Sequence, residues 1–353
     1  MKKIYTAEPE YVEVCGAPVP DIFVSAGEDY ASIRENIALL PGDGYCALQI
    51  EGEGAEDLLE SLAAKDVRYL MPGKAFESFI LDEDASVVGN VIVINQGDGY
   101  ILLSAYENAP AVKDFITRKN QGAQITDLLE DHTLFFLEGP TSWKLIRQVL
   151  GVEVESVALR DMIDFTFQGS KVMLVRIGRS TEYAYCFLAE DGAVEALIAA
   201  IRSYDGARVG FAGKAALDIC MIETGYPITT REIMDQGNLL ELGYQWLIQY
   251  EKEEFSGREK LMELFHAGVE KEKILFTFDG EADLTGKAVS FEGKEVGKVL
   301  VSVYDSAISK TIGYALLQKN YAAAGVAYAL EDGLIESVSA PVIRPLSWSL
   351  VME

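Results

Sequence analysis

The stretch AFESFILDEDASVVGNVIVINQGDGYILLSAY, from Ala75 to Tyr106, decides the fold class. It contains three strand-like runs, which are separated by the clusters DEDAS and NQGDG. Acidic and glycine-rich clusters of this kind are typical of tight turns between antiparallel neighbours. The stretch therefore predicts an antiparallel meander, and we place it in a subdomain that covers about residues 50–130.

Strands and helices alternate on both sides of this meander. A strand at Tyr45–Ile50, a glycine turn and an amphipathic helix precede it, and a helix, a strand and a second helix follow it within residues 109–151. Further hairpins continue the pattern to about residue 270, which favours an α+β architecture over a doubly wound nucleotide fold. No G-x-G-x-x-G motif follows a strand, and the sequence has no Walker loop. Residues 271–353 show short strands with glycine turns at regular spacing, which predicts a small β-barrel or sandwich.

A helix with an unusual end is predicted at ALDICMIETGYPITTREI, from Ala216 to Ile233. Gly225 suits a left-handed C-cap, and Tyr226-Pro227 then turns the chain toward the centre of the molecule. Glu223 falls in the last helical turn, where the helix dipole disfavours a carboxylate, so it requires a compensating partner. A structural hydrogen bond is favoured for Glu223, and contact with a ligand is the alternative.

Composition excludes several classes of function. The formal net charge of −26 disfavours nucleic acids, anionic membranes and acidic protein partners. No apolar run approaches the length of a membrane span, and the first residues lack the apolar core of a signal peptide, so we expect a cytoplasmic location. The four cysteines and two histidines are scattered, which predicts no metal site, no disulfide framework and no histidine-based triad.

Several segments together resemble the glycine-cleavage T-protein, or aminomethyltransferase, family. They include AAKDVRYLMPGKAFESFILDEDASVVGNVIVI, LFFLEGPTSWKLIRQVLG, ALDICMIETGYPITTREI, LGYQWLIQYEKEEFSGREKL and KEVGKVLVSVYD, and the similarity runs from about residue 40 to the C-terminus. The resemblance implies a folate-binding cloverleaf of three domains. Two intertwined α/β subdomains with largely antiparallel sheets would occupy residues 1–270, and a small β-barrel would occupy residues 271–353.

The resemblance also implies which positions face the pterin, and this chain departs from the family at most of them. The position of the family's catalytic aspartate holds Asn90, and the upstream tyrosine position holds Glu77. Asn90 is either a neutral group that orients a ligand or an ordinary turn asparagine after Gly89. A second tyrosine position holds Arg179, so Glu77 and Arg179 form an ion pair or recognise a zwitterionic ligand if both line the cavity. The alternative, that both are solvated surface charges, is favoured.

The other implied cofactor-binding positions are mixed in chemistry. Glu182 is retained, whereas the pterin-edge glutamate is replaced by Cys186 and the arginine by Met221, both of which are ordinary apolar fillers. The asparagine after the third strand has no clear counterpart, although Tyr106 lies nearby, and Trp246 is read as core more readily than as a ligand platform. The pterin-binding edge is therefore lost or rebuilt.

Two hypotheses remain. The favoured one is a tetrahydrofolate-dependent transferase that moves a methyl or aminomethyl group from a small methylated or amino compound. The alternative is a non-catalytic small-molecule-binding protein on the same fold that no longer binds folate. A glycine-cleavage role is disfavoured, because an acidic lipoyl carrier protein would be repelled by the charge of this chain. The segment KEEFSGRE has phenylalanine where the iron–sulfur-assembly relatives have cysteine, so that role is not supported.

Overall fold

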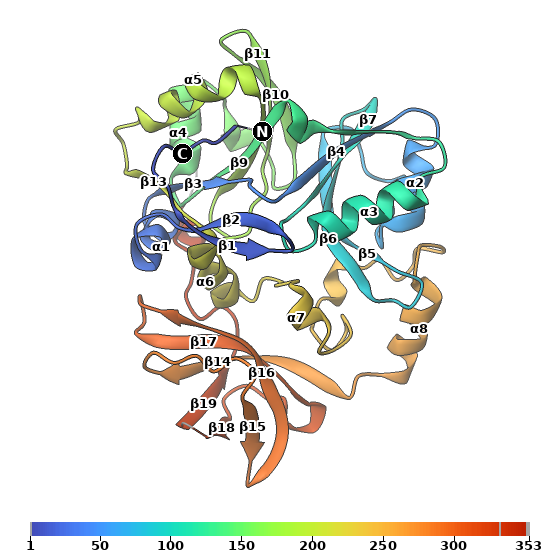
Figure 1. The fold of residues 1–353 in the computed structure, drawn as a ribbon, viewed down its shortest axis with the longest axis vertical. Helices are drawn as coiled ribbons and strands as arrows, with labels where there is room; N and C mark the ends of the chain where they lie inside the picture. Colours follow the sequence, from blue (N-terminus) through green and yellow to red (C-terminus); the bar gives the residue numbers. More distant parts are fainter. Residues whose placement is uncertain (1, 332, 351–353) are drawn as a thin grey trace.

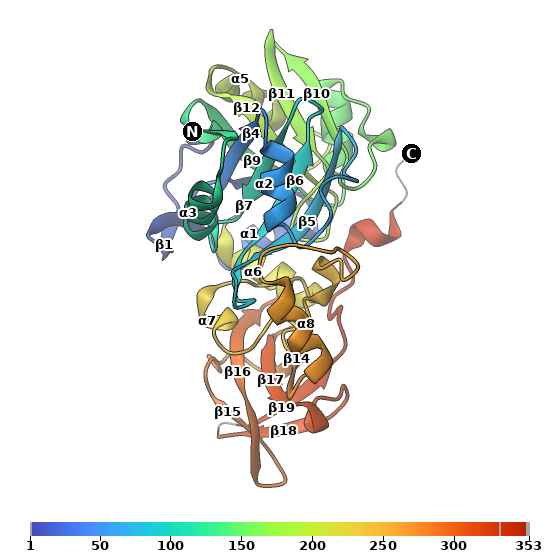
Figure 2. The ribbon, with the colours of Figure 1, turned by 90° about the vertical axis from the view of Figure 1, so that its right-hand side faces the viewer.

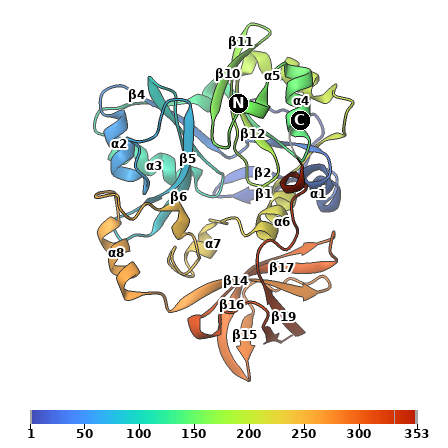
Figure 3. The same ribbon diagram turned by 180° about the vertical axis from the view of Figure 1, so that it is seen from behind.

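The computed structural model describes residues 2–331 and 333–350. The ribbon forms three lobes around a common centre, two of them above and a β-barrel below in the view of Figure 1. Each upper lobe is built on its own sheet, of six and of five strands. Helix α6 (Lys214–Thr224) lies where the three lobes meet (Figures 1 and 3).

The first lobe is a six-stranded sheet with the strand order β10-β11-β12-β9-β3-β13. All neighbours are antiparallel except β13 and β3, which are parallel. Helices α4 and α5 supply apolar side chains to the cluster on one face of this sheet. Its elements are β3 (Ile37–Pro41), β9 (His132–Glu138), α4 (Ser142–Leu145), β10 (Met162–Phe167), β11 (Ser170–Val175), β12 (Ala184–Glu190), α5 (Asp191–Arg202) and β13 (Val209–Phe211).

The second lobe is a five-stranded antiparallel sheet with the order β5-β6-β7-β4-β8. Alternate residues of a strand point to opposite faces, so Ile80 packs among the helices α2 and α3, whereas Phe79 packs in the core at the centre of the molecule. The elements are β4 (Cys46–Glu51), α2 (Ala55–Leu62), β5 (Lys74–Leu81), β6 (Val87–Asn95), β7 (Gly99–Ser104), α3 (Ala109–Lys119) and β8 (Gln124–Asp127).

The third lobe is a closed barrel with the strand order β14-β17-β16-β15-β18-β19. Strand β14 pairs with both β17 and β19, which closes the ring of hydrogen bonds. The strands are β14 (Lys271–Asp279), β15 (Ala288–Phe291), β16 (Lys294–Asp305), β17 (Lys310–Gln318), β18 (Ala327–Leu330) and β19 (Gly333–Val338).

The remaining elements connect the lobes. They are a two-stranded hairpin of β1 (Glu10–Val14) and β2 (Ala17–Ile22), and the helices α1 (Ala26–Arg34), α7 (Arg231–Met234) and α8 (Arg258–Ala267). After the barrel, the chain returns to the upper part of the molecule (Figure 2) and forms a short 3₁₀ turn at Leu346–Ser349. This returning segment matters for the site, because it forms part of a cavity wall.

The predicted fold class is confirmed: the sheets are largely antiparallel, and the C-terminal strands close into a barrel. The meander is present as β5, β6 and β7, and Gly225 is the left-handed C-cap of α6 with φ 77°. The helix after Pro140 begins as α4 and continues as one π-helical turn up to Gly151. In the described part of the chain, none of the helices is long and apolar enough to cross a membrane.

Candidate functional site

The site begins with two polar side chains on neighbouring strands of the meander. In the register of β5 and β6, Glu77 lies opposite Ile92 and Phe79 lies opposite Asn90. Glu77 and Asn90 are therefore diagonal neighbours on one face of the sheet, within reach of each other's side chains. Asn90 Nδ2 donates a hydrogen bond of 2.7 Å to Oε1 of Glu77. Asn90, which the resemblance places at the catalytic position, thus holds the Glu77 carboxylate of the adjacent strand.

Tyr226 is the second donor to this carboxylate. It directly follows Gly225, whose left-handed conformation ends α6 and turns the chain toward the second lobe. The Tyr226 hydroxyl donates to Oε1 of Glu77 at 2.8 Å. Burial and the adjacent Glu77 carboxylate raise the pKa of Tyr226, so the hydroxyl keeps its proton and acts as a donor. The guanidinium of Arg160 lies 3.8 Å from the other oxygen, Oε2.

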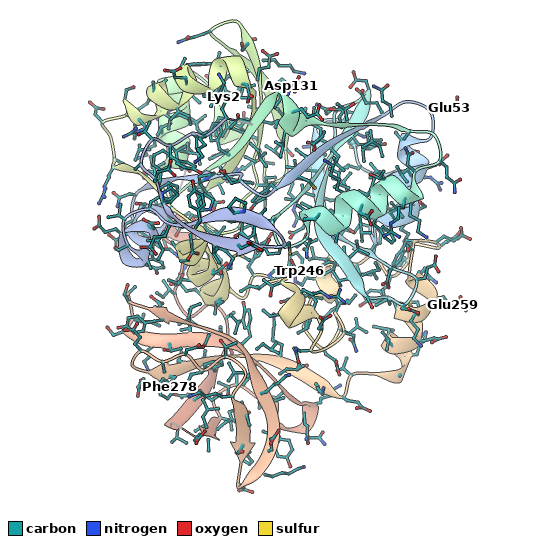
Figure 4. The ribbon with its side chains drawn as sticks, viewed as in Figure 1. Lys2, Glu53, Asp131, Trp246, Glu259 and Phe278 are labelled. Carbon is teal, nitrogen blue, oxygen red and sulfur yellow. The ribbon has the colours of Figure 1, made fainter. Side chains whose placement is uncertain are left out.

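An outer cavity of about 340 Å³ opens above this cluster. Aromatic rings form much of its wall, and two of them, Trp246 and Trp348, are about half exposed. Figure 4 shows Trp246 near the centre of the molecule, between the lobes. The lining residues are Phe76, Glu77, Ile92, Leu159, Arg160, Arg176, Ile177, Gly178, Thr181, Glu182, Tyr183, Ala184, Tyr226, Trp246, Ser347 and Trp348.

A smaller inner cavity of about 40 Å³ shares four lining residues with the outer one, namely Glu77, Ile92, Gly178 and Tyr226. Asn90 and Arg179 line the inner cavity but not the outer one. Glu77 therefore stands at the junction of two adjoining cavities, which lie between the first and second lobes.

Arg179 forms an ion pair with Glu107, which the sequence did not indicate as its partner. Its guanidinium binds Glu107 in a bidentate way, with Nη2 to Oε1 at 2.6 Å and Nη1 to Oε2 at 3.3 Å. Burial lowers the pKa of Arg179, but the paired Glu107 carboxylate outweighs this effect, and the net pKa is raised. Both Arg179 and Glu77 are buried, so the expectation of two solvated surface charges is wrong. They pair with different residues rather than with each other.

Glu182 belongs to a structural network at the edge of the outer cavity. Its carboxylate accepts hydrogen bonds from Arg34 Nη1 at 3.2 Å and from the backbone N–H groups of Leu346 and Ser347 at 3.1 and 2.9 Å. The same Arg34 binds Glu223, which supplies the compensating partner that the last turn of α6 requires. Glu182 thus fastens the returning C-terminal segment to the first lobe.

Three further predicted positions line neither of the two cavities. Cys186 and Met221 are fully buried in the central core, as apolar fillers would be, and line neither cavity. Tyr106 is buried beneath the Arg179 guanidinium, which lies 5.4 Å from its ring centroid. Trp246, by contrast, is 48% exposed and forms part of the cavity wall, so its interpretation as a core residue is wrong.

Sequence reasoning missed Glu107, Arg160, Arg176 and Trp348. Glu107 directly follows Tyr106, so the sequence indicates that it lies near the meander. Its ion pair with Arg179, which is 72 residues away in the sequence, has no local sequence signal. Trp348 lies at the far end of the chain and reaches the cavity through the returning segment. Among the described residues, no group of three or more histidine, cysteine or acidic side chains is placed to hold a metal ion.

The chain is similar to known proteins over most of its length. Residues 3–252 match the family model described as the GCVT N-terminal domain. The aminomethyltransferase of Halothermothrix orenii is 24% identical to this chain, and the similar region covers 89% of each of the two chains. The aminomethyltransferase of Bdellovibrio bacteriovorus is also 24% identical, over 91% of this chain and 90% of its own. The crystal structure of glycine cleavage system aminomethyltransferase T from Bartonella henselae has the same fold, with a TM-score of 0.83 at 17% identity, covering 96% of this chain and 95% of that one. The match to the family model spans well over half of the sequence, and the chain therefore belongs to the glycine-cleavage T-protein (GCVT) family, as a divergent member.

Proposed function

We propose that this protein transfers a one-carbon unit, as a methyl or aminomethyl group, from a small methylated or amino compound to tetrahydrofolate. The observation that carries the proposal is the position of Glu77 at the junction of two adjoining cavities, one with aromatic walls. Such an arrangement allows two ligands to meet beside one carboxylate. The names of the curated relatives, which are aminomethyltransferases, support the same class of reaction.

The residues of the outer cavity fit a reduced folate in their chemistry. Trp246 and Trp348 offer flat apolar surfaces to aromatic rings. The guanidinium groups of Arg160 and Arg176 suit the carboxylates of a glutamyl tail. Tetrahydrofolate would supply the nitrogens that accept the one-carbon unit. The protein's own residues would hold the ring system and exclude water from the junction.

A second candidate function is a non-catalytic binding protein that no longer binds folate. It is favoured by the small size of the inner cavity and by the bidentate pair of Arg179 and Glu107 beside it. Asn90 is also neutral, so it cannot supply the charge that an aspartate at that position would give. In both candidates we propose a small-molecule ligand in a cytoplasmic protein, and the net charge of −26 disfavours nucleic acid, an anionic membrane surface or an acidic lipoyl carrier protein as a partner.

Calorimetric titration with tetrahydrofolate separates the two candidates. A dissociation constant in the micromolar range, about −8 kcal/mol, supports the transferase. The Trp246→Ala variant should bind more weakly, whereas the control Tyr69→Ala should bind as the wild type does, because Tyr69 is 81% exposed and lines neither cavity. An Asn90→Asp variant, titrated beside them, reports whether a second carboxylate at the junction is tolerated. No heat and no thermal stabilisation at millimolar tetrahydrofolate would reject the transferase and leave the binding protein.

A further inference from the structure

Glu77 has one oxygen that is firmly held and one that is not. Oε1 accepts hydrogen bonds from both Asn90 and Tyr226, at 2.7 and 2.8 Å. For Oε2 the described residues provide the Arg160 guanidinium at 3.8 Å, which is beyond hydrogen-bonding distance. Arg160 is also about one-third exposed, so water screens its charge. The carboxylate is thus fixed in orientation by one oxygen and keeps acceptor capacity at the other.

The side chain of Glu182, the second acidic residue that lines the outer cavity, is fully buried, so a ligand in the cavity does not reach its carboxylate. Glu182 receives the Arg34 guanidinium on Oε1 together with the N–H of Leu346, and Oε2 receives the N–H of Ser347. Of the carboxylates that line the two cavities in the described structure, Glu77 is therefore the one available to a ligand.

Three guanidinium groups also line the two cavities, but Arg179 is paired with Glu107 and Arg160 is screened by water, so the Glu77 carboxylate at the junction still attracts a positively charged nitrogen. Tyr226 and Ile92 line both cavities beside it, and Trp246 and Trp348 complete the wall of the outer one. A carboxylate flanked by aromatic rings attracts a cation through charge-assisted hydrogen bonds and through the ring faces. The cavity lining is also mostly apolar, which suits the methyl groups of a small amine.

We propose that Glu77 binds the protonated amine of the substrate, that Asn90 and Tyr226 are positioning residues that hold its carboxylate, and that the substrate is consequently a small cationic amine. This inference rests on the proposed function, since it names the substrate class of the same cavity. The negative charge of the site lies on β5, and the amide on β6 keeps it in place.

The probe is dimethylammonium, with 2-propanol as a neutral molecule of similar shape, and binding is followed by ligand-observed NMR titration. Wild-type protein should prefer the cation. Glu77→Gln should weaken dimethylammonium binding about tenfold or more, because hydrogen bonds between charged groups are among the stronger ones. The affinity for 2-propanol should change by less than about twofold, since its contacts are largely apolar.

A charge-swapped variant, Glu77→Gln with Asn90→Asp, separates charge from packing. It returns a carboxylate to the junction and keeps an amide beside it, so cation binding should recover to within about threefold of the wild type. Cooperative thermal unfolding of each variant shows that it is folded. Equal affinities of wild type and Glu77→Gln for dimethylammonium would overturn the inference, as would a swapped variant as weak as the single one. So would a wild-type protein with no preference for the cation over 2-propanol.

Titration of the same wild-type sample with tetrahydrofolate keeps the two proposals distinct. A protein that prefers the cation through Glu77 but does not bind tetrahydrofolate refutes the transferase and leaves the amine site intact. If the protein binds tetrahydrofolate but Glu77→Gln does not change its affinity for dimethylammonium, the amine site alone is refuted.

Discussion

Replacement of Arg34 by methionine should destabilise the protein strongly, although Arg34 lines neither cavity. The side chain lies at the end of α1 and is 95% or more buried, and both of its carboxylate partners are fully buried. It donates to Glu223 from Nε at 2.9 Å and from Nη2 at 2.6 Å, and to Glu182 from Nη1 at 3.2 Å. Methionine keeps the length of the side chain but leaves two buried carboxylates without their cation.

We expect a loss of about 3–5 kcal/mol in the free energy of unfolding, which is the usual result of removing one partner from a buried ion pair. Urea denaturation followed by far-UV circular dichroism measures this loss. The control Arg34→Lys keeps the charge but loses the forked geometry, so its loss should be intermediate.

The pH dependence of this loss has a definite sign. Burial raises the pKa of Glu223 to about 7, above its value in the unfolded chain. Glu223 is largely protonated below that pH and then does not require a cation, so the effect of Arg34→Met should be smaller at pH 6 than at pH 8. A loss below about 1 kcal/mol at pH 8 would refute the reasoning, because it would mean that the two carboxylates do not depend on Arg34.

Three further predictions concern other parts of the molecule. Burial lowers the pKa of Lys273 to about 7, so between pH 7 and 10 the unfolded chain holds a proton that the folded protein lacks. The stability of the wild type relative to Lys273→Met should therefore rise with pH, by at most about 1.4 kcal/mol per unit, and a constant difference in urea-derived free energies would contradict this. Gly178→Ala should destabilise by about 1–3 kcal/mol in thermal unfolding, because the new Cβ would lie 2.1 Å from Cβ of Ala184; an unchanged midpoint would mean that the junction of the cavities can expand. Trp246→Ala should leave the thermal midpoint nearly unchanged and weaken tetrahydrofolate binding about tenfold; equal affinities would remove Trp246 from the ligand wall.

The fold was predictable because its signals are local. The turns at DEDAS and NQGDG, the left-handed Gly225 and the regular strand spacing after Lys273 each depend on a few adjacent residues. The structure also contains elements without such signals. Strand β13 has three residues, and β2 contains Pro18 and Pro20, which argue against a strand unless it lies at an edge.

The site was less predictable, because its contacts join residues that are distant in the sequence. The bond between Asn90 and Glu77 depends on the register of β5 against β6, which includes a bulge between Ile80 and Leu81. Cys186 could be aligned with a ligand position, but the strand alternation of β12 turns its side chain into the central core. Arg179 gave no indication of Glu107 as its partner.

The returning C-terminal segment also has a consequence for biosynthesis. Ser347 and Trp348 form one wall of the outer cavity, whereas Phe76 and Glu77 form another, so the pocket draws on residues separated by about 270 positions. While the chain is still on the ribosome, the two upper lobes and most of the barrel can fold, but this pocket stays open on one side. A ligand that contacts Trp348 can therefore gain that part of its binding energy only after translation has passed this residue, so the upper lobes must reach their fold without it.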